Sequence, residues 1–119
     1  MPTSDDRALC WVNEYGGHVY VITRSDLSPR QQLVQTNHAS IEAVRNGLIS
    51  THSAHPHLVL CSVPSEQELN ELTYKLQNKK IGFSIFTEPD LNNQITAIAT
   101  EPLTGNRRNP LRNLPLIGE

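Results

Sequence analysis

The residues best suited to chemistry lie in and after a turn near residue 25. Arg24 and Asp26 follow an expected strand at 18–24, and ligands of open α/β sheets collect outside the carboxyl ends of strands. Four polar side chains then recur at spacings of four, three and four residues: Gln31, Gln35, His38 and Glu42. On a helix these spacings form one polar stripe, which can line a cleft or be a solvated helix face. Arg24 and Asp26 can also simply pair across the turn.

A strand and a helix must position these residues. Segment 18–24 reads HVYVITR, which is β-branched and aromatic and therefore typical of a strand. Ser28, Pro29 and Gln31 have the form of a capping box, so a helix is expected to begin there. Its apolar residues fall in one sector at 100° per residue, with Val34 at the edge: Leu33, Ile41, Val44 and Leu48. We expect this sector to pack on the sheet and the helix to fray near 47–50.

The rest of the chain predicts three more strands and one more helix. Segment 57–63 (HLVLCSV) is nearly continuously apolar, which indicates a central strand covered on both faces. Ser65 and Glu68 form a second capping box. Strands are expected at 82–88 and 95–101, joined as a hairpin. The order β-α-β-α-β-β predicts a single α/β domain with a four-stranded mixed sheet and flanking helices.

Composition sets limits on the function. A chain of 119 residues fits one domain, and its apolar runs are too short to span a membrane. Asp5 and Asp6 stand where a secretion signal would carry positive charge, so we expect a cytoplasmic protein. The net charge of -2 excludes strong nonspecific attraction to nucleic acid, so a nucleic-acid ligand would need a local basic patch.

Both ends of the chain differ from its middle. Residues 1–17 form an N-terminal extension whose segment 8–12 (ALCWV) can add an edge strand or pair with another chain. Residues 18–102 form the main domain. Residues 103–119 are expected to be a proline-containing basic tail, extended with at most a turn of helix. Arg107 and Arg108 in this tail can contact phosphates or be solvated.

Cysteine and histidine spacings do not indicate a metal site. Cys10 and Cys61 lack a CxxC spacing, so we expect reduced structural thiols. His52, His55 and His57 have spacings of three and two, but Pro56 lies between them and no fourth ligand is near. We interpret these histidines as part of an ordinary loop, and we expect no metal and no cofactor.

Several motifs together resemble one family. Arg24-Ser-Asp26-Leu27, followed by Gln35-Thr-Asn-His38-Ala39, resembles the signature of the type II peptidyl-tRNA hydrolases. Val-Pro-Ser-Glu-Gln-Glu-Leu at 63–69 resembles that family's stretch of strand, proline and acidic helix start. Glu88 and Thr96 fall where the family has an acidic residue after its third strand and a threonine entering its last. The resemblance covers about 18–102 and implies the family's fold.

The resemblance also implies an activity. The family hydrolyses the ester between a peptide and the 3′ end of tRNA, so tRNA or peptidyl-tRNA is the implied partner, and a homodimer is implied as well. The reaction needs a positioned water, a proton acceptor and donors to the oxyanion. The implied catalytic residues are His38 as the titrating group, Asp26 and Glu88 as orienting carboxylates, and Thr96 as a donor.

One departure from the family concerns the substrate-binding residues. Where the best-known branch has a glycine-lysine pair, this chain has Arg30-Gln31, so it resembles a divergent branch without that lysine. Arg30 can replace the cation only if its side chain turns into the cleft. The expected substrate-binding residues are Arg24, Arg30, Gln31, Gln35, Arg107 and Arg108. The alternative is a catalytically inactive tRNA-binding or protein-interaction module on the same fold.

Overall fold

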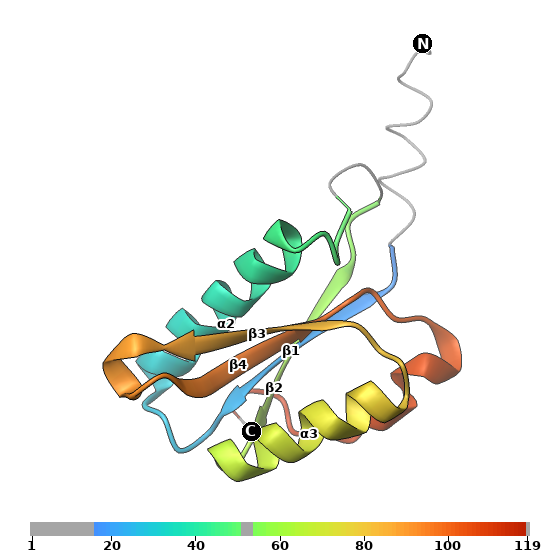
Figure 1. The fold of residues 1–119 in the computed structure, drawn as a ribbon. Helices are drawn as coiled ribbons and strands as arrows, with labels where there is room; N and C mark the ends of the chain where they lie inside the picture. The colour runs from blue at the N-terminus through green and yellow to red at the C-terminus, as the bar shows by residue number, and fades with distance from the viewer. Residues whose placement is uncertain (1–15, 51–53, 119) are drawn as a thin grey trace.

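Strands and helices alternate along the first half of the chain, as the sequence predicts. The computed structural model describes residues 16–50 and 54–118, so most of the expected N-terminal extension lies outside the described residues. The order of elements is β1 (His18–Arg24), α2 (Pro29–Arg45), β2 (His57–Val63), α3 (Glu66–Asn78), β3 (Phe83–Glu88), η1 (Pro89–Leu91), β4 (Gln94–Thr100) and η2 (Gly105–Leu111), where η marks a 3₁₀ helix. Figure 1 shows this arrangement.

The four strands form one mixed sheet in the order β2-β1-β4-β3. β1 runs parallel to β2, and β4 runs antiparallel to both β1 and β3. The predicted α/β domain with a four-stranded mixed sheet is therefore confirmed. β4, the second strand of the hairpin, lies between β1 and β3. Because β4 runs antiparallel to β1, its start lies next to the end of β1.

The prediction that β2 is central is wrong, because β2 is an edge strand. Its apolar run is buried only at the end, from Cys61 to Val63, while Leu58 is 64% exposed. The C-terminal segment covers part of the open edge, since Ser62 N–H donates to the Pro115 carbonyl and Ile117 N–H donates to the Leu60 carbonyl. A run of apolar residues therefore does not by itself distinguish a central strand from an edge strand that a tail covers.

The two helices lie on opposite faces of the sheet (Figure 1). On one face Leu69, Leu72 and Leu76 of α3 pack in a cluster with Ile22 and Ile98. On the other face α2 contributes only alanines to a smaller apolar cluster with β1 and β4. Of the helices in the described residues, none is both long and apolar enough to cross a membrane.

The predicted ends of α2 are confirmed, and so is the cap of α3. Ser28 Oγ accepts the Gln31 N–H at 3.2 Å, and Ser65 Oγ accepts the Glu68 N–H at 3.4 Å. After Arg45 the Leu48 N–H reaches back to the Ala43 carbonyl, and Gly47 between them has a φ of +78°. This closure needs the left-handed backbone that glycine adopts freely.

The predicted core face of α2 is wrong. Within α2 the expected sector is on the solvent side, with Leu33 53% exposed and Ile41 55% exposed, and Val34 and Val44 are exposed as well. Leu48, the one member of the sector beyond the helix, is half-buried against the apolar cluster. The helix instead buries a polar and small face: Gln32, Gln35, Thr36, Ala39 and Ala43. Ala39 and Ala43 let the helix lie close to the sheet, and hydrogen bonds satisfy the buried amides and hydroxyl.

The C-terminal segment is not the expected extended tail. It forms η2, and Leu103 and Leu111 are fully buried in the larger core cluster. His18 and Leu103 exchange backbone hydrogen bonds of 2.8 and 2.9 Å. The C-terminal segment is therefore anchored to the sheet at Leu103 and Leu111. Burying these two side chains removes apolar surface from water, which favours the docked arrangement.

Cys61 has the structural role that its sequence context predicts. Its side chain is buried and free of a disulfide, and burial raises the pKa of its thiol to about 11. A thiol with so high a pKa carries almost no reactive thiolate near neutral pH. Cys10, the other expected structural thiol, lies outside the described residues.

Candidate functional site

Arg24 and Asp26 form a two-bond ion pair at the carboxyl end of β1. Arg24 Nε donates to Asp26 Oδ1 at 3.0 Å, and Arg24 Nη2 donates to Oδ2 at 2.9 Å. Because β4 starts beside the end of β1, Arg24 Nη1 also donates to Gln94 Oε1 at 2.9 Å and to the Ile95 carbonyl at 3.1 Å. The guanidinium is buried and committed to four acceptors, so it holds the turn on the start of β4.

The ion pair fixes the charge of Asp26. The hydrogen bonds from Arg24 hold the pKa of the Asp26 carboxyl below its ordinary value, and those same bonds raise the pKa of the guanidinium. A carboxylate with a lowered pKa is a weak proton acceptor near neutral pH. Asp26 is thus better suited to orienting a partner than to accepting a proton.

Gln35 connects the helix to both β3 and β4. Its Nε2 donates to Glu88 Oε1 at 2.9 Å and to Gln31 Oε1 at 3.1 Å. Its Oε1 accepts the Thr96 hydroxyl at 2.6 Å. Gln35 and Thr96 are both fully buried, so they position other groups and do not face solvent.

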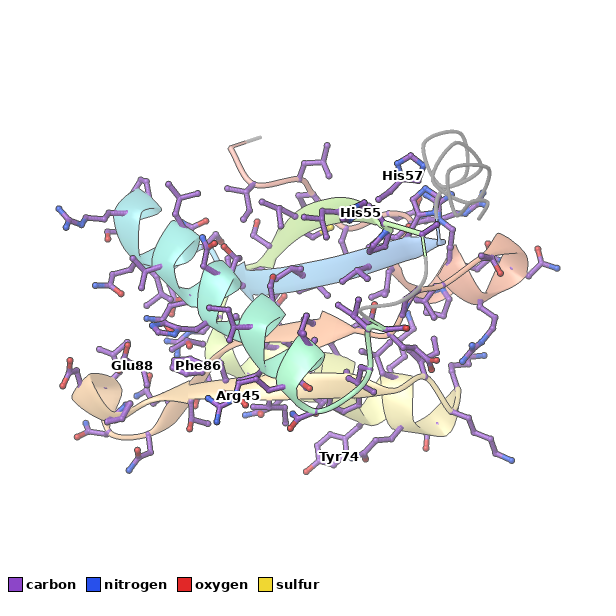
Figure 2. The ribbon with its side chains drawn as sticks, turned by 90° about the horizontal axis from the view of Figure 1, so that it is seen from above. Arg45, His55, His57, Tyr74, Phe86 and Glu88 are labelled. Atoms are coloured by element: carbon purple, nitrogen blue, oxygen red, sulfur yellow. The ribbon has the colours of Figure 1, made fainter. Side chains whose placement is uncertain are left out.

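Glu88 is the partly exposed end of this network. It is the last residue of β3, and its Oε2 accepts the Asp90 N–H at 3.5 Å, which caps η1. Gln35 binds its other carboxylate oxygen, so the carboxylate has a fixed orientation. Figure 2 shows Glu88 and Phe86 along β3 beside α2.

His38 lies on the same side of the sheet, one turn after Gln35. Its ring stacks on Phe86, with centroids 4.3 Å apart and an interplanar angle of 5°. Within the described residues it makes no hydrogen bond or ion pair, and it is exposed. The stacking holds the plane of an imidazole that is itself exposed to solvent, which suits a proton acceptor.

Comparison with solved structures shows a likeness of fold alone. No family model matches the chain, and no curated protein matches its sequence. The chain is similar to a protein of unknown function, Atu0240, from Agrobacterium tumefaciens strain C58, with a TM-score of 0.65. The two are 13% identical, and the match covers 87% of this chain and 98% of that chain. A fold hosts many functions, so the site must carry the functional argument.

The structure brings together most of the residues that the sequence singles out. Hydrogen bonds join Gln31, Gln35, Glu88 and Thr96 directly, and β4 links this group to Arg24 and Asp26. Arg30 is exposed in the first turn of α2 and forms no ion pair with any described residue. Arg107 and Arg108 lie in η2, which packs at the opposite end of β1, where Arg108 contacts Tyr20.

Sequence reasoning missed three contributors to the site. Gln94 and Glu66 accept hydrogen bonds from Arg24 and from the Ile95 N–H, and Phe86 supports His38. Phe86 is two residues before Glu88 on the same strand, so the alternation of strand side chains places both on one face. That alternation is the signal that could have identified Phe86.

Two histidines of the expected loop, His55 and His57, lie within the described residues. Among residues 16–50 and 54–118, no three His, Cys, Asp or Glu side chains are grouped as metal ligands. His55 is exposed, and His57 begins β2, where its ring stacks on His18. His52 lies outside the described residues.

Proposed function

We propose that this protein hydrolyses the ester bond of peptidyl-tRNA, as a cytoplasmic enzyme with a fold like that of the type II peptidyl-tRNA hydrolases. The observation that carries the proposal is the hydrogen-bonded set Gln31, Gln35, Glu88 and Thr96, which lies with His38 on one face of the sheet. Gln35, Glu88 and Thr96 are residues of the motif resemblance, although Gln35 is far from the other two in the sequence. Gln31 stands where the chain departs from the family.

His38 is the proton acceptor in this proposal. An imidazole can accept a proton, and the exposed side chain of His38 is open to a water that it would activate. Phe86 holds the ring plane, and Glu88 offers a fixed carboxylate on the strand that carries Phe86. Gln35 and Thr96 act as positioning residues, because neither reaches solvent.

The oxyanion of the tetrahedral intermediate needs donors that the ion pair at the turn does not readily supply. Arg24 uses four of its five N–H groups on Asp26, Gln94 and Ile95. Exposed Arg30 and the amide of Gln31 are the donors nearest in sequence to the family's missing lysine. This commitment of Arg24 favours a second candidate function, a module that binds the acylated end of tRNA without cleaving it.

The decisive experiment follows release of free tRNA from peptidyl-tRNA. The proposal expects release above background, and expects His38→Ala to lower the rate by roughly 10²–10⁴-fold, the usual contribution of a positioned acid or base. His55→Ala is the matched control, because His55 is an exposed histidine of the loop before β2, and it should leave the rate unchanged. No release, or equal rates for His38→Ala and the wild type, rejects the enzyme.

The second candidate has a separate readout. A module that only binds would shift acylated tRNA in a gel without releasing the peptide, and its affinity would fall steeply with salt. Binding without cleavage by both the wild type and His38→Ala would support this module over the enzyme. The resemblance also implies a homodimer as the active form, which sedimentation equilibrium tests directly.

A further inference from the structure

A pocket lies at the end of the sheet away from Glu88. Figure 2 shows His57 and His55 at one end of the molecule and Glu88 and Phe86 toward the other. The pocket has a volume of about 300 Å³ and is lined by Gly17, His18, His57, Thr104, Gly105 and Arg108. We call it the His18 pocket. No part of the proposed hydrolysis uses these residues.

Two imidazoles form one wall of the His18 pocket. His18 and His57 are register partners on the parallel strands β1 and β2, and their rings stack with centroids 4.6 Å apart. Nδ1 of His18 is buried, and it has no hydrogen-bond partner among the described residues. A buried polar atom without a partner is uncommon in folded proteins, and a bound ligand or water is one physical explanation for it.

Arg108 forms the other wall and is held in place. Its Nε donates to the Tyr20 hydroxyl at 2.9 Å, and its guanidinium lies 5.9 Å from the centre of the Tyr20 ring. These contacts use the Nε–H and leave the Nη groups without a described partner. A fixed guanidinium with unused N–H groups is the side chain best suited to binding a phosphate oxygen.

Among the described residues, the charged groups that act on the pKa of His18 are cations. Burial lowers this pKa most, Arg108, His57 and Arg112 lower it further, and a backbone interaction with Leu103 raises it in part. Two of these cations, Arg108 and Arg112, belong to η2 and its C-cap. Glu101 is paired with Arg107 at 3.1 Å, on the side of η2 away from Arg108.

We propose that the His18 pocket binds a phosphate group. The anion would accept hydrogen bonds from Arg108 and from a protonated His18, and it would supply the negative charge that the pocket lacks. A metal ion fits less well, because stacked rings present their faces and not their lone pairs to each other, and no third ligand is grouped with them among the described residues.

Binding must then depend on pH in a defined direction. In the free protein burial and the nearby cations lower the pKa of His18, while a bound dianion raises it, so binding is coupled to proton uptake. Affinity is highest at pH values below the pKa of His18 in the free protein, and it falls as pH rises from that value through the pKa of the complex, by up to about tenfold for each unit of difference between the two pKa values. Sulfate is the right probe, since phosphate itself gains a proton at a pKa of about 6.

The first test titrates the protein with sulfate while NMR records the imidazole signals of His18 and His57. We expect saturable shifts of both, and at least about tenfold weaker binding in Arg108→Gln, because one charge-assisted donor pair is lost. Arg107→Gln is the matched control. It removes the same charge from the residue that precedes Arg108 in η2, and Arg107 lines a different pocket. Equal weakening by the two variants, or no shift at His18, would overturn the proposal in favour of a diffuse basic surface.

The second test uses His18→Phe, which keeps an aromatic ring beside His57 but removes Nδ1. The proposal expects sulfate binding to vary less between pH 5.5 and 7.5 in this variant than in the wild type, and any dependence that remains is assigned to His57, the other histidine of the pocket. Equal pH dependence in the variant and the wild type would reject the role of His18. The phosphate group can come from free phosphate or from a nucleic acid, and competition with bound sulfate distinguishes these two sources. Displacement by a short RNA with a 5′ phosphate, but not by inorganic phosphate, assigns the pocket to nucleic acid.

Discussion

Gln35 determines how the candidate site is arranged at the scale of single residues. One buried amide joins the exposed Gln31 and Glu88 to the buried Thr96 hydroxyl, so all of its bonds depend on one orientation of the amide. Sequence spacing identified Gln35 as a member of a polar stripe, but not as a buried residue. Burial could not be inferred, because Gln is usually exposed unless its hydrogen bonds are satisfied.

The Thr96–Gln35 bond gives the first prediction. Thr96→Val removes the hydroxyl that donates to Gln35 Oε1 and should lower the free energy of unfolding by about 1–3 kcal/mol, the usual loss for an unsatisfied buried acceptor. Urea denaturation measures the change. Thr87→Val on the exposed side of β3 should change stability by less than about 0.5 kcal/mol. Similar small losses of stability in both variants would show that the Thr96–Gln35 hydrogen bond does not stabilise the protein.

Asp26 gives a prediction about pH. The pKa of its carboxyl is lowered in the folded state, so its stabilisation is present above the unfolded value, near 3.8, and is lost as pH falls through the folded value. Asp26→Asn should therefore destabilise the protein at pH 7 by about 1 kcal/mol, a modest amount because the side chain is 42% exposed and solvent screens the pair.

Below the folded pKa of Asp26 the difference between Asp26→Asn and the wild type should disappear, because both then carry a neutral group. Denaturation curves at a series of pH values falling from 7 test this, with Asp90→Asn as the control at an exposed position. A difference that persists unchanged at the lowest pH would mean that Asp26 stabilises the turn without its charge.

At the scale of elements, α2 separates what the sequence can predict from what it cannot. Its ends follow from local chemistry, Ser28 and Pro29 at the start and Gly47 after the end. The rotation of α2 about its own axis does not follow from the sequence. Helices usually turn their apolar sector toward the core, but α2 lies close to the sheet over the small side chains of Ala39 and Ala43. β2 was misplaced in the sheet for a related reason, since its covering segment is far away in sequence.

The rotation of α2 can be tested with a pair of substitutions. Ala39→Leu inserts three heavy atoms where α2 meets the sheet and should destabilise the protein by about 1–3 kcal/mol. Ile41→Lys, on the 55% exposed side, should change stability by less than about 0.5 kcal/mol. Thermal unfolding of both variants measures the difference. A larger loss of stability in Ile41→Lys than in Ala39→Leu would contradict the observed rotation and favour the one that the apolar sector predicts.

At the scale of the whole molecule, sheet topology decides which residues meet. Arg24 meets Gln94 and Ile95 only because β4 is inserted between β1 and β3, and this insertion cannot be derived from the spacing of the motifs. The resemblance supplied the identities of the site residues, while the fold supplies their contacts. The C-terminal segment was misjudged because its core leucines are isolated among prolines and asparagines.

The docking of that segment gives a further prediction. Leu111→Ala should lower the free energy of unfolding by about 2–5 kcal/mol, as for other fully buried leucines. Leu116→Ala is the control, because Leu116 is 43% exposed in the same segment and should lose about 1 kcal/mol or less. Guanidinium denaturation measures both, and equal small effects would indicate that the C-terminal segment does not belong to the core.

Chemical-shift mapping with a stable analogue of the proposed substrate's reacting end tests the central claim most directly. The probe is an adenosine whose 3′ position carries an amide-linked acylated amino acid, which resists the proposed hydrolysis. We predict saturable amide shifts confined to Ser25–Leu27, the first three turns of α2 and Phe86–Glu88, where the network and His38 lie. Saturable shifts confined to the residues around Arg108, or none at a concentration that saturates a true hydrolase, would contradict the proposed site.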